Sequence, residues 1–116
     1  MGEYTGRDWH RLQQRGATAL ASVLAYGYRM GLPAVAWTLN TMGDLVADVH
    51  GLTVTAADQR AAFDVWCDYL AADRWRERTD SDGMTYLHAV FTWRDDPRVK
   101  GAVRAVIFPA DDGRSA

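Results

Sequence analysis

Cysteine is almost absent from this sequence, and its scarcity excludes several classes of protein. The chain of 116 residues holds one cysteine, Cys67. A single cysteine cannot form a disulfide within the chain, and it cannot supply the several thiolates of a cysteine-based metal cluster. We therefore expect a protein of a reducing compartment, the cytoplasm. Its fold should be held together by one hydrophobic core.

An excess of positive charge is also missing. The formal net charge is −2, the sequence pI is about 5.8, and Lys100 is the only lysine among 13 basic residues. General binding to nucleic acid usually depends on a basic excess, because lysine and arginine replace the counterions of the phosphates. The composition therefore argues against a general polyanion binder and leaves only local basic patches to consider.

No hydrophobic run is long enough to cross a membrane. The longest candidate, residues 17–28, follows three arginines: Arg7, Arg11 and Arg15. Asp8 interrupts the basic region, Gly27 and Arg29 break the apolar run, and about 20 apolar residues are needed to span a bilayer. We expect neither a signal peptide nor a membrane-bound protein.

What the sequence does contain is typical of one globular domain. Hydrophobic residues make up 48% of the chain and charged residues 24%, close to the average for soluble domains. A chain of this length buries roughly two-thirds of its unfolded surface in one core. We predict a single α+β domain over residues 1–116, with residues 110–116 as a flexible tail.

Two helices are indicated by apolar residues at three- and four-residue spacing. The first runs from about Thr5 or Arg7 to Met30, and Gly31 and Pro33 end it. The second begins after Thr55, which forms a capping arrangement with Asp58. Its apolar face is formed by Ala62, Phe63, Trp66, Cys67 and Leu70.

Five strands account for the remaining β-favouring segments: residues 34–40, 45–50, 74–79, 85–94 and 99–108. The order is α-β-β-α-β-β-β. Links between successive strands are short enough for antiparallel pairing, which favours a mainly antiparallel sheet. We predict a two-layer sandwich, with two helices packed on one face of a five-stranded sheet.

That architecture leaves one face of the sheet without a cover. Large aromatic side chains such as Trp37, Tyr86, Trp93 and Phe108 cannot all be assigned to the helix-facing side. Tryptophan and tyrosine are frequent anchors of protein interfaces, because they bury a large area at small entropic cost. We name Trp37, Tyr86 and Trp93 as a candidate interaction surface for a protein partner or a second copy of the chain.

A second candidate surface is an arginine stripe. Arg74, Arg76 and Arg78 alternate with other residues, so a regular strand would present all three on one side, and Arg104 could extend the stripe. Such a stripe could follow phosphates. The alternative is a solvated edge strand, in which the charges prevent edge-to-edge pairing and nearby aspartates neutralise them.

A third candidate combines two imidazoles and a carboxylate. Asp48 and His50 are two residues apart on a predicted strand, and His88 lies on a later strand. These groups can bind zinc or transfer protons. A carboxylate and a histidine at this spacing are more often a hydrogen-bonded surface pair, so we name a metal-dependent hydrolase only as an alternative, and we expect no cofactor.

Several short segments are similar to small uncharacterised proteins of Streptomyces and related actinobacteria. They are Leu32-Pro33, Trp37, Phe63, Trp66, Arg74-Trp75, Arg78-Thr79, Gly83 and Thr85-Tyr86-Leu87-His88-Ala89. The resemblance implies a bacterial cytoplasmic accessory protein, and it implies no activity, cofactor or catalytic residue.

The leading hypothesis from the sequence is a non-catalytic module for protein interaction or self-association. Apolar and aromatic residues are plentiful and no catalytic set stands out, so we expect that the protein is not an enzyme. Either the open sheet face or the first helix would form the contact. An accessory factor for nucleic acid, working through the arginine stripe, is the main alternative.

Overall fold

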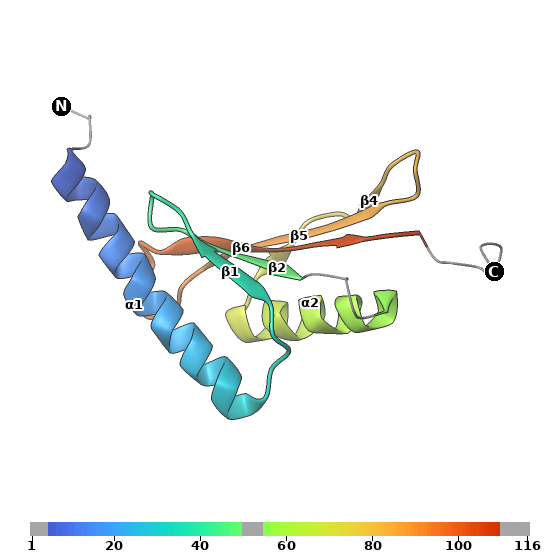
Figure 1. The fold of residues 1–116 in the computed structure, drawn as a ribbon, viewed down its shortest axis with the longest axis horizontal. Helices are drawn as coiled ribbons and strands as arrows, with labels where there is room; N and C mark the ends of the chain where they lie inside the picture. Colours follow the sequence, from blue (N-terminus) through green and yellow to red (C-terminus); the bar gives the residue numbers. More distant parts are fainter. Residues whose placement is uncertain (1–4, 50–54, 110–116) are drawn as a thin grey trace.

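The chain forms an α+β fold of two helices and one mixed sheet (Figure 1). The computed structural model describes residues 5–49 and 55–109. The helices are α1 (Gly6–Met30) and α2 (Ala56–Leu70). The strands are β1 (Ala36–Leu39), β2 (Leu45–Val49), β3 (Asp73–Arg74), β4 (Arg78–Thr79), β5 (Thr85–Thr92) and β6 (Lys100–Ile107).

Both helices begin, and α1 ends, where their local sequences predict. Thr5 and Asp8 form a reciprocal capping box at the start of α1, and the hydroxyl of Thr55 accepts from the amide of Asp58 at the start of α2. Gly31 ends α1 in the left-handed conformation, with φ of 68°. The predicted start and end of α1 and the predicted cap of α2 are confirmed.

The strands lie in the order β1-β2-β6-β5-β3, and β4 also pairs with β5. All pairs are antiparallel except β2 and β6, which run parallel, with Ala47 opposite Val103. The sequence did not predict this parallel pair, because short hairpin links gave no sign that the final strand would insert beside β2. The predicted strand at 74–79 is also wrong in one respect: it is divided into β3 and β4.

One face of the sheet carries the core. Alternate residues of β2, β5 and β6 are buried there, namely Leu45, Ala47, Val49, Leu87, Ala89, Phe91, Val103, Ala105 and Ile107. Helix α2 covers this face and contacts β6, β5 and β2. In Figure 1, α2 and the C-terminal half of α1 lie below the sheet, and the N-terminal half of α1 extends past the end of the sheet to the upper left.

Gln59 is the only buried polar or charged residue among those described, and it joins two strands. Its side-chain nitrogen donates to the carbonyl oxygens of Val106, at 3.0 Å, and Val49, at 3.4 Å. These carbonyls belong to the parallel strands β6 and β2. The buried amide therefore fixes α2 over the parallel pair, and its own donor is satisfied.

Helix α1 packs against the first hairpin, formed by β1 and β2, and against α2. Gly16 lies against Gly43 and Leu39 of the first hairpin, and Gly27 lies against the ring of Trp66. Tyr26 of α1 stacks on Tyr69 of α2 with ring centroids 3.8 Å apart. These contacts cover one side of α1 only.

Candidate functional site

A bulge divides the edge strand and changes the arginine stripe. Arg74 and Arg78 are four positions apart, but their partners Ala89 and Tyr86 are only three positions apart. One extra residue in a strand sends the side chains that follow to the other face. Arg74 therefore lies on the α2 side, whereas Arg78 lies on the uncovered side, and the predicted alternation of three arginines is wrong.

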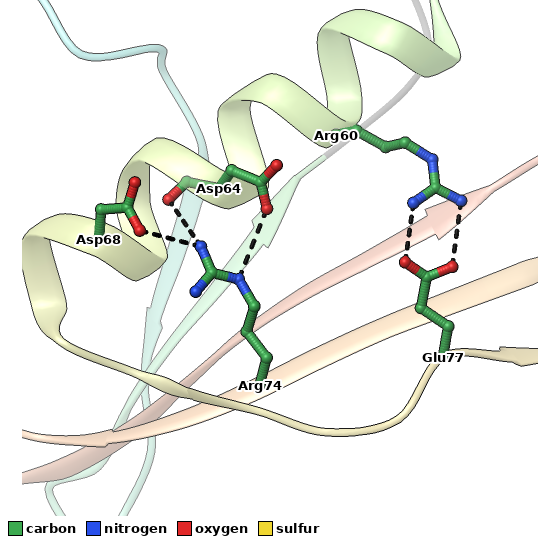
Figure 2. A network of polar contacts seen from close by, with 5 residues as sticks. All are labelled: Arg60, Asp64, Asp68, Arg74 and Glu77. Carbon is green, nitrogen blue, oxygen red and sulfur yellow. Dashed lines mark hydrogen bonds and ion pairs between the residues drawn. The ribbon is translucent and has the colours of Figure 1, made fainter.

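Arg74 is held by the helix (Figure 2). Its Nη2 donates to Oδ1 of Asp68 at 3.0 Å and to the backbone oxygen of Asp64 at 3.3 Å, and its Nε lies 3.5 Å from Oδ1 of Asp64. A guanidinium with two carboxylate neighbours is a poor phosphate ligand. Arg74 thus connects the edge strand to α2, and it does not belong to an arginine stripe on the uncovered side of the sheet.

A second ion pair supports the bulge from the same side. Arg60 of α2 binds Glu77 through two hydrogen bonds of 2.8 and 3.2 Å (Figure 2). The hydrogen bond from Arg60 lowers the pKa of the Glu77 carboxyl. Both side chains are half exposed, so the pair contributes more to the position of the bulge than to the free energy of unfolding.

The uncovered side of the sheet, which we call the open face, bears side chains from β2, β6, β5 and the bulged edge. Its residues are Val46 and Asp48 of β2, Ala102, Arg104 and Val106 of β6, Tyr86, His88 and Val90 of β5, and Trp75 and Arg78 of the bulged edge. Trp75 belongs here because its amide donates to the carbonyl of His88. The face is thus largely apolar and aromatic, and one row across it contains Asp48, Arg104 and His88.

That row contains two of the three residues of the predicted metal site, Asp48 and His88. Arg104 lies between Asp48 and His88 in the register, and it binds Asp48 through Nε at 3.0 Å and Nη2 at 3.2 Å. Asp48 and His88 are therefore two strand spacings apart, about 10 Å at the backbone. Among the described residues no group of three histidine, cysteine, aspartate or glutamate side chains could hold a metal ion. His50 lies outside the described residues.

The environment of His88 favours its neutral form. Burial lowers the pKa of the imidazole, and the positive charge of Arg104 lowers it further. The ring of Trp75 stacks on His88, with centroids 4.1 Å apart and the planes tilted by 38°. His88 therefore supports an aromatic surface, and its location beside a guanidinium does not suit a cation ligand.

Arginines surround this stack at one end of the open face. The guanidinium of Arg78 lies 4.2 Å from the ring centroid of Tyr86, whose hydroxyl donates to Asp80 at 2.9 Å. A hollow of about 430 Å³ lies among these aromatic and arginine side chains. Its side chains include Trp75, Arg76, Arg78, Tyr86, His88 and Arg104, and we call these six residues the aromatic–arginine site.

The three aromatic residues of the predicted interaction surface do not share one face. Tyr86 is on the open face. Trp93 continues the buried alternation of β5 and is only 4% exposed, and Trp37 lies opposite buried Ala47 with its ring edge against Trp66. Trp37 and Trp93 thus contribute to the core, because strand alternation places them on the helix side.

Trp75 was not predicted from the sequence as a site residue, although it is 59% exposed and is the most accessible of the rings that we assign to the open face. Its location beside Arg78 on one face depends on the bulge, and no pattern in the sequence predicts the bulge. The first helix was named from the sequence as a possible contact, but the residues of its outer side were not. Residues 16–28 contain no charged side chain, yet Ala17, Ala21, Leu24 and Tyr28 are all exposed. An exposed helix surface normally carries charges, so this signal was readable in the sequence.

No helix within the described residues has the length and apolarity to cross a membrane. Comparison with protein-family models, with curated proteins and with solved structures gave no match to this chain.

Proposed function

We propose that this protein is a non-catalytic self-association module that forms a homodimer through α1. The observation that carries the proposal is the uncharged outer stripe of the helix, formed by Ala17, Ala21, Leu24 and Tyr28. Leu24 is 49% exposed and Tyr28 is 92% exposed. A helix that is apolar on both its inner and outer sides is usually buried on both.

The spacing of the stripe suits a second helix. Its members are separated by four, three and four residues, which aligns them on one side of the cylinder as in paired helices. The segment 17–28 is about 18 Å long at 1.5 Å per residue. Alanines at two of the four positions allow the backbones of two helices to approach closely.

When α1 of a second protomer packs antiparallel to α1 of the first, the side chains of the two stripes are complementary in size. When Ala21 of one protomer lies opposite Leu24 of its partner, Ala17 lies opposite Tyr28. Each large side chain then faces a small one, and the two-fold axis repeats both contacts. An isologous interface needs this kind of self-complementary surface. We also propose that this is a cytoplasmic protein of an actinobacterium, as the resemblance implies.

The test is the mass of the protein in solution. We expect size-exclusion chromatography with light scattering to give a dimer whose fraction grows with loading concentration, because a contact of this length is at the small end of specific interfaces. Leu24→Arg should give a monomer, since it places two guanidiniums in an apolar contact. Ala21→Trp should weaken the dimer without adding charge.

Met42→Arg is the matched control. Met42 is 45% exposed, similar to Leu24, and lies in the turn between β1 and β2 rather than on α1. This variant should keep the dimer, and all variants should retain the far-ultraviolet circular dichroism of the native protein. A wild-type monomer at every concentration would exclude self-association. A dimer that survives Leu24→Arg would exclude α1 as its interface.

A further inference from the structure

We propose that the aromatic–arginine site of the open face binds a nucleotide unit, a planar base joined to a phosphate. This inference uses a different surface from α1 and does not depend on dimer formation. It begins with Trp75, whose ring is supported by His88 and remains 59% exposed. An exposed indole held in place by a second ring is a suitable platform for a base, since every base has a π-face.

The second element is a pair of available guanidiniums. Among the described residues, no carboxylate forms an ion pair or hydrogen bond with Arg76 or Arg78. Most other arginines of the sheet, its connecting turns and α2 are paired with an acid: Arg60 with Glu77, Arg74 with Asp68, Arg98 with Asp96 and Arg104 with Asp48. Arg76 and Arg78 can therefore bind a phosphate without first breaking an ion pair.

The hollow between these groups has a suitable size. About 430 Å³ is within the range of small-ligand sites and accommodates one nucleotide. The neutral state of His88 also helps, because a neutral imidazole packs against an indole without needing a counterion. A simple anion would use the arginines alone, and a simple aromatic ligand would use Trp75 alone. The combination favours a ligand that carries both groups.

The open face continues beyond this site toward Val46, Val90 and Ala102, which line a second hollow of about 540 Å³. The charged residues of that hollow are of both signs: Asp44, Asp73, Arg94 and Lys100. A single strand of nucleic acid could extend in that direction, whereas a free nucleotide would use the first hollow only. Both sources present the same base and phosphate, so the experiment must separate them.

The experiment measures binding to purified full-length protein. Fluorescence anisotropy with a labelled 12-nucleotide oligo(dT) provides the strand, and competition with unlabelled TMP and AMP provides the free nucleotide. Trp75→Ala should weaken binding about tenfold or more, because stacking contributes about 1–3 kcal/mol per base. Trp75→Phe retains a ring and should remain within a few-fold of the native protein.

The double variant Arg76→Ala with Arg78→Ala should weaken binding and reduce its dependence on salt, since fewer counterions are displaced. Arg98→Ala is the charge control: it removes an exposed arginine from the turn before β6 and should leave binding unchanged. Competition by mononucleotide at a concentration similar to that of the oligonucleotide identifies a free nucleotide as the ligand. Much stronger binding of the strand identifies single-stranded nucleic acid.

Three results would overturn the proposal. One is the absence of binding to both oligonucleotide and mononucleotide. Another is binding that Trp75→Ala leaves unchanged and that heparin, a polyanion without bases, displaces equally well. The third is preferential binding of a phosphotyrosine peptide, because the same pairing of ring and phosphate would then belong to a protein partner.

Discussion

Cys67 illustrates how burial decides the chemistry of one side chain. It is 1% exposed on the inner face of α2, and burial raises the pKa of its thiol to about 11 although the nearby Arg74 acts in the opposite direction. Only the thiolate is an effective nucleophile, so a thiol with this pKa is almost wholly unreactive at neutral pH. The lone cysteine is a small apolar core residue.

This leads to a prediction about labelling. At pH 8, native protein should react with a disulfide reagent such as DTNB far more slowly than protein unfolded in guanidinium chloride, which should label one thiol per chain. Absorbance of the released thiolate measures both rates. Rapid labelling of the native protein, at the rate of the unfolded chain, would mean that Cys67 is accessible.

Among secondary-structure elements, α1 depends on a close approach to the first hairpin. Gly16 is buried, and a methyl group there would collide with the carbonyl oxygen of Gly43 and lie 2.5 Å from Cδ1 of Leu39. Gly43 cannot move aside easily, because it has a φ of 80° and its own missing side chain faces Leu12 of the helix. The two glycines fix the distance between helix and hairpin.

We therefore predict that Gly16→Ala destabilises the fold by about 1–3 kcal/mol, the usual cost of overpacking, even though alanine favours a helix. Gly6→Ala in the first turn is the control, since nothing lies within 4 Å of the added methyl group. It should be neutral or slightly stabilising. Urea unfolding followed by circular dichroism measures both, and equal effects at the two positions would contradict the close contact.

The elements also show what could be predicted from sequence and what could not. The start and end of α1 were predictable because Thr5, Gly31 and Pro33 act on the backbone next to them. The bulge at Arg76 and Glu77 was not, because it exists only against β5 and with Arg60 opposite. The separation of Asp48 and His88 could not be predicted for the same reason, because it depends on β6, which lies between their strands.

On the scale of the whole molecule, the pH dependence of stability has an identifiable contribution from His88. Its pKa is lowered in the folded state, so the unfolded chain binds more protons as the pH falls through the ordinary histidine range near 6.5. Stability from this group is therefore complete above that range and is lost as the solution becomes more acidic.

We predict that the free energy of unfolding decreases from pH 7.5 to pH 5.5, and that His88→Gln makes this decrease smaller because glutamine does not titrate. Carboxylates such as Asp96 and Glu77, whose pKa values are lowered, take up protons only below this pH interval. They therefore contribute little to the slope measured within it. Urea titrations at several pH values measure the slope. Identical slopes for both proteins would show that His88 titrates similarly in the folded and unfolded chains.

The central position of β6 has a consequence for synthesis. This strand pairs with β2 on one side and β5 on the other, yet it is the last of the described strands along the chain. While a ribosome is still adding residues 100–107, the nascent polypeptide lacks β6. The β1-β2 hairpin and the strands around β5 then have no strand between them. The inner edges of β2 and β5 then stay open to other nascent chains. Folding must therefore wait until nearly all of the described sequence has emerged.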